Sequence, residues 1–177
     1  MKPQLKILAQ TKPFLLFIQV STMFFAAVLL FGCSKKSSSG RFEPLMDYMK
    51  QQDQLTAGYL HGDATQARKS LEDLMQYYQD PKTKMLTDTA RAQMLYQTYS
   101  RLFMLETRTG NEAQAKAALT RVNEWQVQFY KLANVSDKDM ADAKKNLTLE
   151  KIQTMVDEMD KRENRGQLPQ YVQAIQK

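Results

Sequence analysis

Hydrophobic residues follow two different patterns along the chain, and the change falls near residue 33. From Phe14 to Phe31 the chain is apolar with few interruptions and no charge, and these eighteen residues lie at the lower limit for spanning a bilayer core. Residues 1–12, before this run, carry three lysines and no acidic side chain. A basic segment followed by an apolar run is typical of a signal peptide or of a membrane anchor, and length alone leaves both interpretations open.

After residue 33, apolar residues recur at the three- and four-residue spacing of amphipathic helices. Together with the turn residues, this spacing predicts helices over about 43–59, 64–79, 88–108 and 112–133. It also predicts a long helix from Ser136 with a break near 146–148, and a short last helix that starts at Pro169. Gln, Ala, Lys, Met and Leu are plentiful, and runs of β-branched residues are missing after residue 33. We therefore expect an all-α domain of antiparallel helical hairpins.

The apolar stripe of each predicted helix gives the residues expected to face the interior. In the first two helices these are Leu45, Met46, Tyr48, Met49, Ala67, Leu71, Leu74, Met75 and Tyr78. In the next two they are Ala92, Leu95, Tyr96, Tyr99, Leu102, Phe103, Leu105, Ala115, Ala118, Leu119, Val122, Trp125, Phe129 and Leu132. In the last part of the chain they are Ile152, Met155, Val156, Met159, Tyr171, Val172 and Ile175. The stripe of 88–108 is so wide that we expect other helices to contact it on more than one side.

The turns carry residues that start and stop helices. Gly62 suits a left-handed turn, and Asp63 with Gln66 three residues later suits a capping box at the start of a helix. Asn111 and Gln114 repeat this arrangement, which predicts a second capping box. Asp80-Pro81 is expected to end a helix, and Gly166 is expected to form a turn.

Charge and composition exclude several kinds of site. Three of the 25 basic side chains lie within 1–32, so the rest of the chain carries 22 basic and 19 acidic side chains, a net charge of +3. So small an excess, with no basic stripe, argues against a nucleic-acid partner. The single cysteine excludes an intramolecular disulfide, and the single histidine, His61, excludes a His-rich metal site. His61 adjoins the Gly62 turn and is expected on the surface.

The segment Leu30-Phe31-Gly32-Cys33 resembles the lipobox of bacterial lipoproteins. The resemblance implies that signal peptidase recognises Leu30, Phe31 and Gly32, that the chain is cut before Cys33, and that Cys33 carries a lipid. Phe31 departs from the pattern, in which a smaller residue is usual. The alternative is an incidental cysteine in a transmembrane helix. By resemblance to Gram-negative lipoproteins, Ser34 favours sorting to the outer membrane, facing the periplasm, and two or more acyl chains give stable anchoring.

These features divide the chain into three parts. We predict a signal peptide over 1–32, a lipidated cysteine with a polar tether over 33–41, and an all-α domain over 42–177. The tether holds Lys35, Lys36 and Arg41 among serines and a glycine, which predicts a solvated linker or a contact with anionic head groups.

A ten-residue pattern occurs twice, 48 residues apart. Residues 62–71 and 110–119 share Gly, Gln, Ala and Leu at equivalent positions. The pattern resembles the second half of a tetratricopeptide repeat, although the family spacing is 34 residues and Gln51 and Gln54 depart from the first-helix pattern. The resemblance implies a right-handed stack of helical hairpins over about 42–134. Another helical bundle remains the alternative, because antiparallel hairpins commonly share glycine turns and caps.

No catalytic, cofactor-binding or metal-binding motif is recognised in the sequence. Glycine-rich phosphate loops are absent, and a lipidated Cys33 is no nucleophile. Neighbouring carboxylates such as Glu72-Asp73 and Asp157-Glu158-Asp160 are interpreted as solvated helix faces, and the charges of 157–165 as a solvated helix end. The chain is therefore not expected to be an enzyme.

The resulting hypothesis is a lipid-anchored periplasmic module that binds a protein or peptide, in envelope assembly or secretion, on the concave surface of its stacked hairpins. The membrane is its first partner, through the lipid. The alternatives are an enzyme or accessory factor that acts on cell-wall polymer, and a purely structural helical spacer.

Replacing the lipid-accepting thiol tests the anchor. We expect Cys33→Ser to abolish lipid labelling and to leave the precursor uncleaved, because acylation of the thiol precedes cleavage in this family. Metabolic labelling with a fatty acid, together with the mass of the product, measures both effects. Normal processing of the variant would contradict the lipobox.

Overall fold

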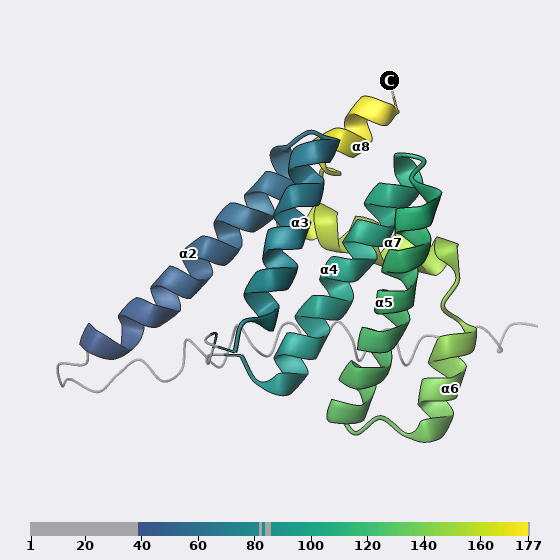
Figure 1. Ribbon diagram of the computed structural model, residues 1–177, viewed down its shortest axis with the longest axis horizontal. Helices are drawn as coiled ribbons and strands as arrows, with labels where there is room; N and C mark the ends of the chain where they lie inside the picture. Colours follow the sequence, from purple (N-terminus) through teal and green to yellow (C-terminus); the bar gives the residue numbers. More distant parts are fainter. Residues whose placement is uncertain (1–38, 82, 84–85, 177) are drawn as a thin grey trace, which may run out of the picture. The chain divides into compact units, whose positions relative to one another are not determined.

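The computed structural model describes residues 39–81, 83 and 86–176 (Figure 1). Within these residues there are seven helices and no strand, which confirms the all-α class and the packing of helices in pairs. Contacts divide the chain into two units, Met1–Gly40 and Arg41–Lys177. The helices of the described residues lie in the second unit, apart from Ser39 and Gly40, which begin the first of them.

The helices are α2 (Ser39–His61), α3 (Ala64–Gln79), α4 (Asp88–Arg108), α5 (Glu112–Leu132), α6 (Asp137–Lys145), α7 (Leu149–Glu163) and α8 (Gln170–Ile175). The predicted break at 146–148 is confirmed, since it separates α6 from α7. Ser136 and Thr148 cap these two helices, and their side chains accept hydrogen bonds from the backbone N–H groups of Asp139 and Lys151. The start of α2 was predicted four residues too late. Pro44 therefore lies in the second turn of α2 and not in its first turn, and it has no backbone N–H to donate there.

Helix α3 follows the sequence closely. The Oδ1 atom of Asp63 accepts from the backbone N–H of Gln66 at 2.9 Å, and Gln66 Oε1 accepts from the backbone N–H of Asp63 at 3.3 Å, so the predicted capping box is confirmed. All five residues predicted to face inward are buried: Ala67, Leu71, Leu74, Met75 and Tyr78. The helix ends at Gln79, before Asp80-Pro81, as expected.

Two predictions about the turns were wrong. Gly62 does not have a positive φ; positive φ values occur at Gly110 (76°) and Gly166 (87°). Gly62 is instead buried, and a Cβ atom there would lie 2.5 Å from the carbonyl oxygen of Gly58, so its role is close approach. Asn111 makes no cap hydrogen bond, because its Nδ2 donates to Glu106 Oε2 at 2.7 Å.

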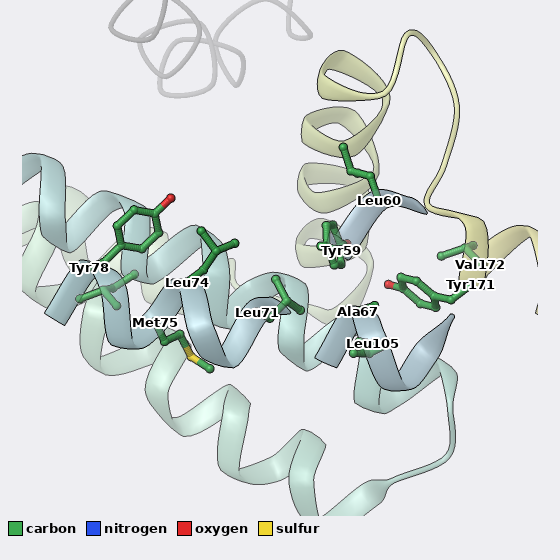
Figure 2. Close-up of a cluster of buried hydrophobic side chains, with 11 residues drawn as sticks. Tyr59, Leu60, Ala67, Leu71, Leu74, Met75, Tyr78, Leu105, Tyr171 and Val172 are labelled. Atoms are coloured by element: carbon green, nitrogen blue, oxygen red, sulfur yellow. The ribbon is translucent and has the colours of Figure 1, made fainter. Parts of the chain in front are cut away.

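The main core lies between α3 and its neighbours (Figure 2). The buried face of α3 packs with Tyr59 and Leu60 of α2, Leu95 and Leu105 of α4, and Tyr171 and Val172 of α8. Helix α4 packs against α3, α5 and α7, so the prediction that it is contacted on several sides is confirmed. Burial of these apolar side chains stabilises the fold by about 1.5–3 kcal/mol for each large side chain.

Several residues predicted to face inward lie on the surface. Met46 is 62% exposed, Met49 is 43% exposed, Leu132 is 41% exposed and Ile175 is 53% exposed. For Met46 the reason is the length of α2. Tyr48 stacks on Tyr77, two residues before the end of α3, so the part of α2 before Tyr48 has no counterpart on α3.

Candidate functional site

The predicted lipidation and recognition residues, Leu30, Phe31, Gly32 and Cys33, lie outside the described residues. Among the helices that are described, none combines the length and apolarity needed to cross a membrane. The described residues also contain no group of three or more His, Cys, Asp or Glu side chains placed to bind a metal ion. His61 is exposed at the end of α2, as expected.

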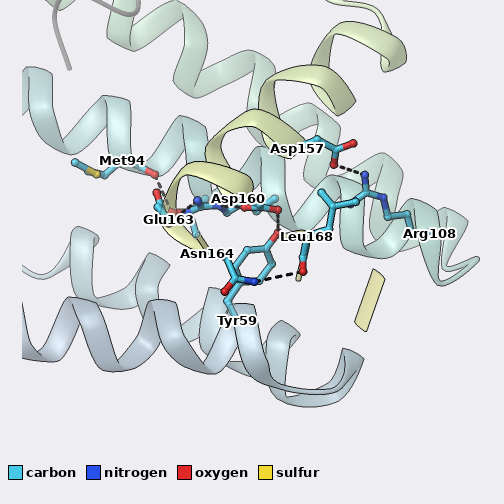
Figure 3. A network of polar contacts seen from close by, with 10 residues as sticks. Tyr59, Met94, Arg108, Asp157, Asp160, Glu163, Asn164 and Leu168 are labelled. Atoms are coloured by element: carbon cyan, nitrogen blue, oxygen red, sulfur yellow. Dashed lines mark hydrogen bonds and ion pairs between the residues drawn. The ribbon is translucent and has the colours of Figure 1, made fainter. Parts of the chain in front are cut away.

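The most unusual feature of the interior is an ionic cluster around Arg101 of α4. Its Nε donates to Asp160 Oδ1 at 2.9 Å, and its Nη2 donates to Glu163 Oε2 at 2.7 Å. The hydroxyl of Tyr59 donates to the second oxygen of Asp160 at 2.7 Å (Figure 3). The guanidinium carbon of Arg101 also lies 5.2 Å from the centre of the Tyr59 ring. The cluster thus joins α2, α4 and α7.

Burial decides the electrostatics of this cluster. The side chains of Arg101 and Asp160 are 7% and 0% exposed. Burial disfavours the charge of Arg101, but Glu163 and Asp160 hold its pKa above the ordinary value. Burial raises the pKa of Asp160, and the nearby Arg101 and the hydrogen bond from Tyr59 offset part of that rise. Burial and then Asp160 raise the pKa of Tyr59 well above 10.0, so its hydroxyl stays protonated and donates.

The prediction of solvated carboxylates on 157–165 was wrong for Asp160 and Asp157. Asp160 follows Ile152 and Val156 at four-residue steps, so it lies on the buried face of α7. Asp157 Oδ1 accepts from Arg108 Nη2 at 2.6 Å, and the two side chains are 21% and 14% exposed. The sequence signal that could have identified the cluster is an arginine four residues before Leu105, on the side of α4 opposite its main apolar stripe, matched by an aspartate in register with the apolar stripe of another helix.

A second ion pair joins α3 to α4. Arg68 Nε and Nη2 donate to the two carboxylate oxygens of Glu106 at 2.5 and 3.0 Å. This two-bond geometry is the most favourable one for an arginine and a carboxylate. The side chain of Glu106 is 1% exposed. Burial raises the pKa of Glu106, but the hydrogen bonds from Arg68 and Asn111 outweigh it and leave the pKa below the ordinary value of 4.5.

Helix α7 lies across α2 and α4. Its contacts with them are the Arg101 cluster, the Arg108–Asp157 pair, and a hydrogen bond of 3.5 Å from the Tyr96 hydroxyl to Met155 Sδ. These contacts hold α7 against Tyr59 of α2 and against Tyr96, Arg101 and Arg108 of α4.

Two of the depressions on the described surface are considered as binding sites. The larger, about 440 Å³, lies where the start of α3, the end of α4 and α8 meet. Its lining residues are Asp63, Ala64, Arg108, Thr109, Gln170, Tyr171, Ala174 and Ile175. Beside it, Arg108 Nη1 and the Tyr171 hydroxyl have no hydrogen-bond partner of good geometry. The smaller depression, about 340 Å³, lies between α2 and α3 and includes Leu55 and Tyr77.

The larger depression, which we call the α8 cavity, is the better candidate binding site. Its walls combine apolar carbon with a guanidinium, which is the usual composition of a ligand site. Sequence reasoning missed it, because its residues come from three helices that are up to 112 residues apart.

Comparisons with protein-family models, curated proteins and solved structures gave no match for the chain.

Removing the buried cation tests how much the cluster contributes to the free energy of unfolding. We expect Arg101→Met to lower the free energy of unfolding by roughly 3–5 kcal/mol, because it leaves the carboxylate of Asp160 buried without its cation. Urea denaturation followed by circular dichroism measures the loss. The control is Arg121→Met, whose ion pair with Glu124 is exposed and should matter little. Equal losses in the two variants would contradict a structural role for Arg101.

The Arg68–Glu106 pair predicts a dependence on pH. Because the folded-state pKa of Glu106 is lowered, its stabilising contribution is complete above about pH 5 and is lost as the pH falls through the folded pKa, below 4.5. We therefore expect Glu106→Gln to be less stable than the wild type at pH 7 and the difference to shrink below pH 4.5. Urea denaturation at a series of pH values measures the gap. An unfolded glutamate titrates near pH 4.3, so a pH of about 3 lies roughly one unit below its pKa. A difference in unfolding free energy that stays constant down to that pH would refute the prediction.

Proposed function

We propose that the protein is a lipid-anchored interaction module of the bacterial cell envelope. In this proposal Cys33 carries the lipid in the outer membrane, and the helical pairs form a tetratricopeptide-like right-handed stack that faces the periplasm. The module binds a protein or peptide partner in envelope assembly or secretion. The proposal is supported by the lipobox-like segment 30–33, by the repeated pattern at 62–71 and 110–119, and by the all-helical domain that follows the tether.

The α8 cavity is the observation that carries the binding part of the proposal. Ile175 at its edge is 53% exposed, and Ala174 lies one residue before it, so the cavity offers apolar surface to a partner. Exposed apolar surface rimmed by polar groups commonly marks a contact with another molecule. Arg108 and Tyr171 lie in its wall and interact with each other without a hydrogen bond of good geometry, and a carbonyl or carboxylate oxygen of a peptide could bind the guanidinium after a small side-chain movement.

A photo-crosslinking side chain at Ala174 tests the site. The full chain is expressed with the crosslinker at Ala174 or, as a control, at Ala117 on the exposed face of α5. After irradiation, the membranes are solubilised and the adducts identified by mass spectrometry. We expect a discrete protein adduct from Ala174 and none of the same identity from Ala117.

A pair of filling substitutions shows whether the cavity itself binds. Ala174→Trp should fill the cavity and abolish capture of that partner by a tagged full-length chain, whereas Ala117→Trp should leave capture unchanged. Both variants add the same side-chain volume, so they differ only in its position. The circular dichroism spectrum of each variant is compared with that of the wild type to check that it is folded. An adduct that survives Ala174→Trp, or release of muropeptides when the protein is incubated with purified sacculi, would contradict the proposed function.

A further inference from the structure

The first half of α2 carries an apolar stripe that no described residue covers. Met46 is 62% exposed and Met49 is 43% exposed. Figure 1 shows this half of α2 diverging from α3. On the same side of the helix, the exposed Asp53 ends the stripe one turn after Met49, and Leu60 further on is only 4% exposed because the hydrophobic core encloses it. The second half of α2 is thus packed in the core, whereas its first half exposes apolar side chains.

The free end of the stripe has the pattern of an amphipathic helix. The sequence holds Phe at position 42, Leu at 45, and Met at 46 and 49, which is the i, i+3, i+4, i+7 spacing of one helical face. Tyr48 lies on a different side, where it stacks on Tyr77 of α3. Asp47 is exposed on a further side of the helix, so up to Met49 the apolar positions gather on one side, and Asp53 marks the end of that side.

The distance along the chain to Cys33 limits where this stripe can lie. Ser39 is the sixth residue after Cys33, and a fully extended chain of that length spans at most about 20 Å. Met46 is seven residues further, which adds about 10 Å along a helix. A lipid on Cys33 therefore keeps Met46 within about 30 Å of a bilayer surface, whatever path the tether takes.

The charge of the connecting segment favours the same neighbour. Lys35, Lys36 and Arg41 lie between Cys33 and the stripe, and residues 34–42 contain no acidic side chain. Cations next to a membrane anchor are attracted to anionic head groups. An amphipathic helix of this kind lies in the plane of the interface with its apolar face in the boundary between head groups and acyl chains.

We propose that the first half of α2 lies on the anionic bilayer that holds the lipid, with Met46 and Met49 in contact with its acyl chains. This inference rests on the lipid anchor of the proposed function. It gives α2 two roles, since its second half packs in the core and its first half contacts the membrane. The helical domain is thereby oriented on the bilayer instead of moving freely on a flexible tether.

Depth-dependent quenching tests the contact. The full-length lipoprotein is reconstituted into vesicles of phosphatidylethanolamine and phosphatidylglycerol, with an environment-sensitive fluorophore attached at Met46→Cys or Met49→Cys. The control is Gln54→Cys, an exposed position on the same helix. We expect nitroxide-labelled lipids to quench the fluorophores at 46 and 49 severalfold more than the one at 54. Equal quenching at the three positions would overturn the inference.

Two further readouts separate the possible failures. The mass of the N-terminal peptide shows whether Cys33 is lipidated. A lipidated chain without quenching at 46 and 49 overturns the membrane contact and leaves the proposed anchor intact, whereas an unmodified Cys33 overturns both. The second readout is quenching by aqueous iodide. If the fluorophores at 46 and 49 are protected from iodide but are not quenched by the labelled lipids, a protein and not the bilayer covers the stripe, and the inference is overturned.

Discussion

The structure depends on one buried cation. Arg101 lies in the middle of α4 with a side chain that is 7% exposed, and an isolated charge there would be very unfavourable. Asp160 and Glu163 of α7 neutralise it, and Tyr59 of α2 completes the hydrogen bonding of Asp160. A shift of α7 by one residue would rotate Asp160 away from Arg101, so the cluster opposes small slips of this helix. Hydrophobic contacts drive the helices together, and the ionic cluster selects how α7 crosses α2 and α4.

The Arg101 cluster holds α7 against Tyr59 of α2 and against α4, and two other features of the surface stay open. The α8 cavity and the apolar stripe around Met46 remain on the described surface. They belong to different proposed contacts, one with a protein or peptide and one with the bilayer. The hydrophobic core around α3 lies between these two features, since it includes Tyr59 of α2 and Tyr171 of α8.

Local features were predictable from the sequence and distant pairings were not. The stripe of α3, its capping box at Asp63 and the break before Thr148 depend on residues within one or two turns of each other. The pairing of Arg101 with Asp160 spans 59 residues, and periodicity alone shows which face of a helix is apolar but not which helix covers it. The role of Gly62 was ambiguous for a similar reason. The position needs a glycine because a Cβ atom would approach the carbonyl oxygen of Gly58 too closely, and not because its φ is positive. The α8 cavity is assembled from three helices and leaves no local signal.

Native-state hydrogen exchange tests most directly whether the Arg101 cluster makes α7 an integral part of the fold. The measurement compares the opening free energies of amides in α7, around Ile152 and Val156, with those in α4, around Leu95 and Leu105, over a series of low urea concentrations. We expect both sets to exchange through the same global unfolding, with equal free energies and equal dependence on urea. Exchange of α7 at a clearly lower free energy, without dependence on urea, would show that α7 detaches locally and would contradict the central role of the cluster.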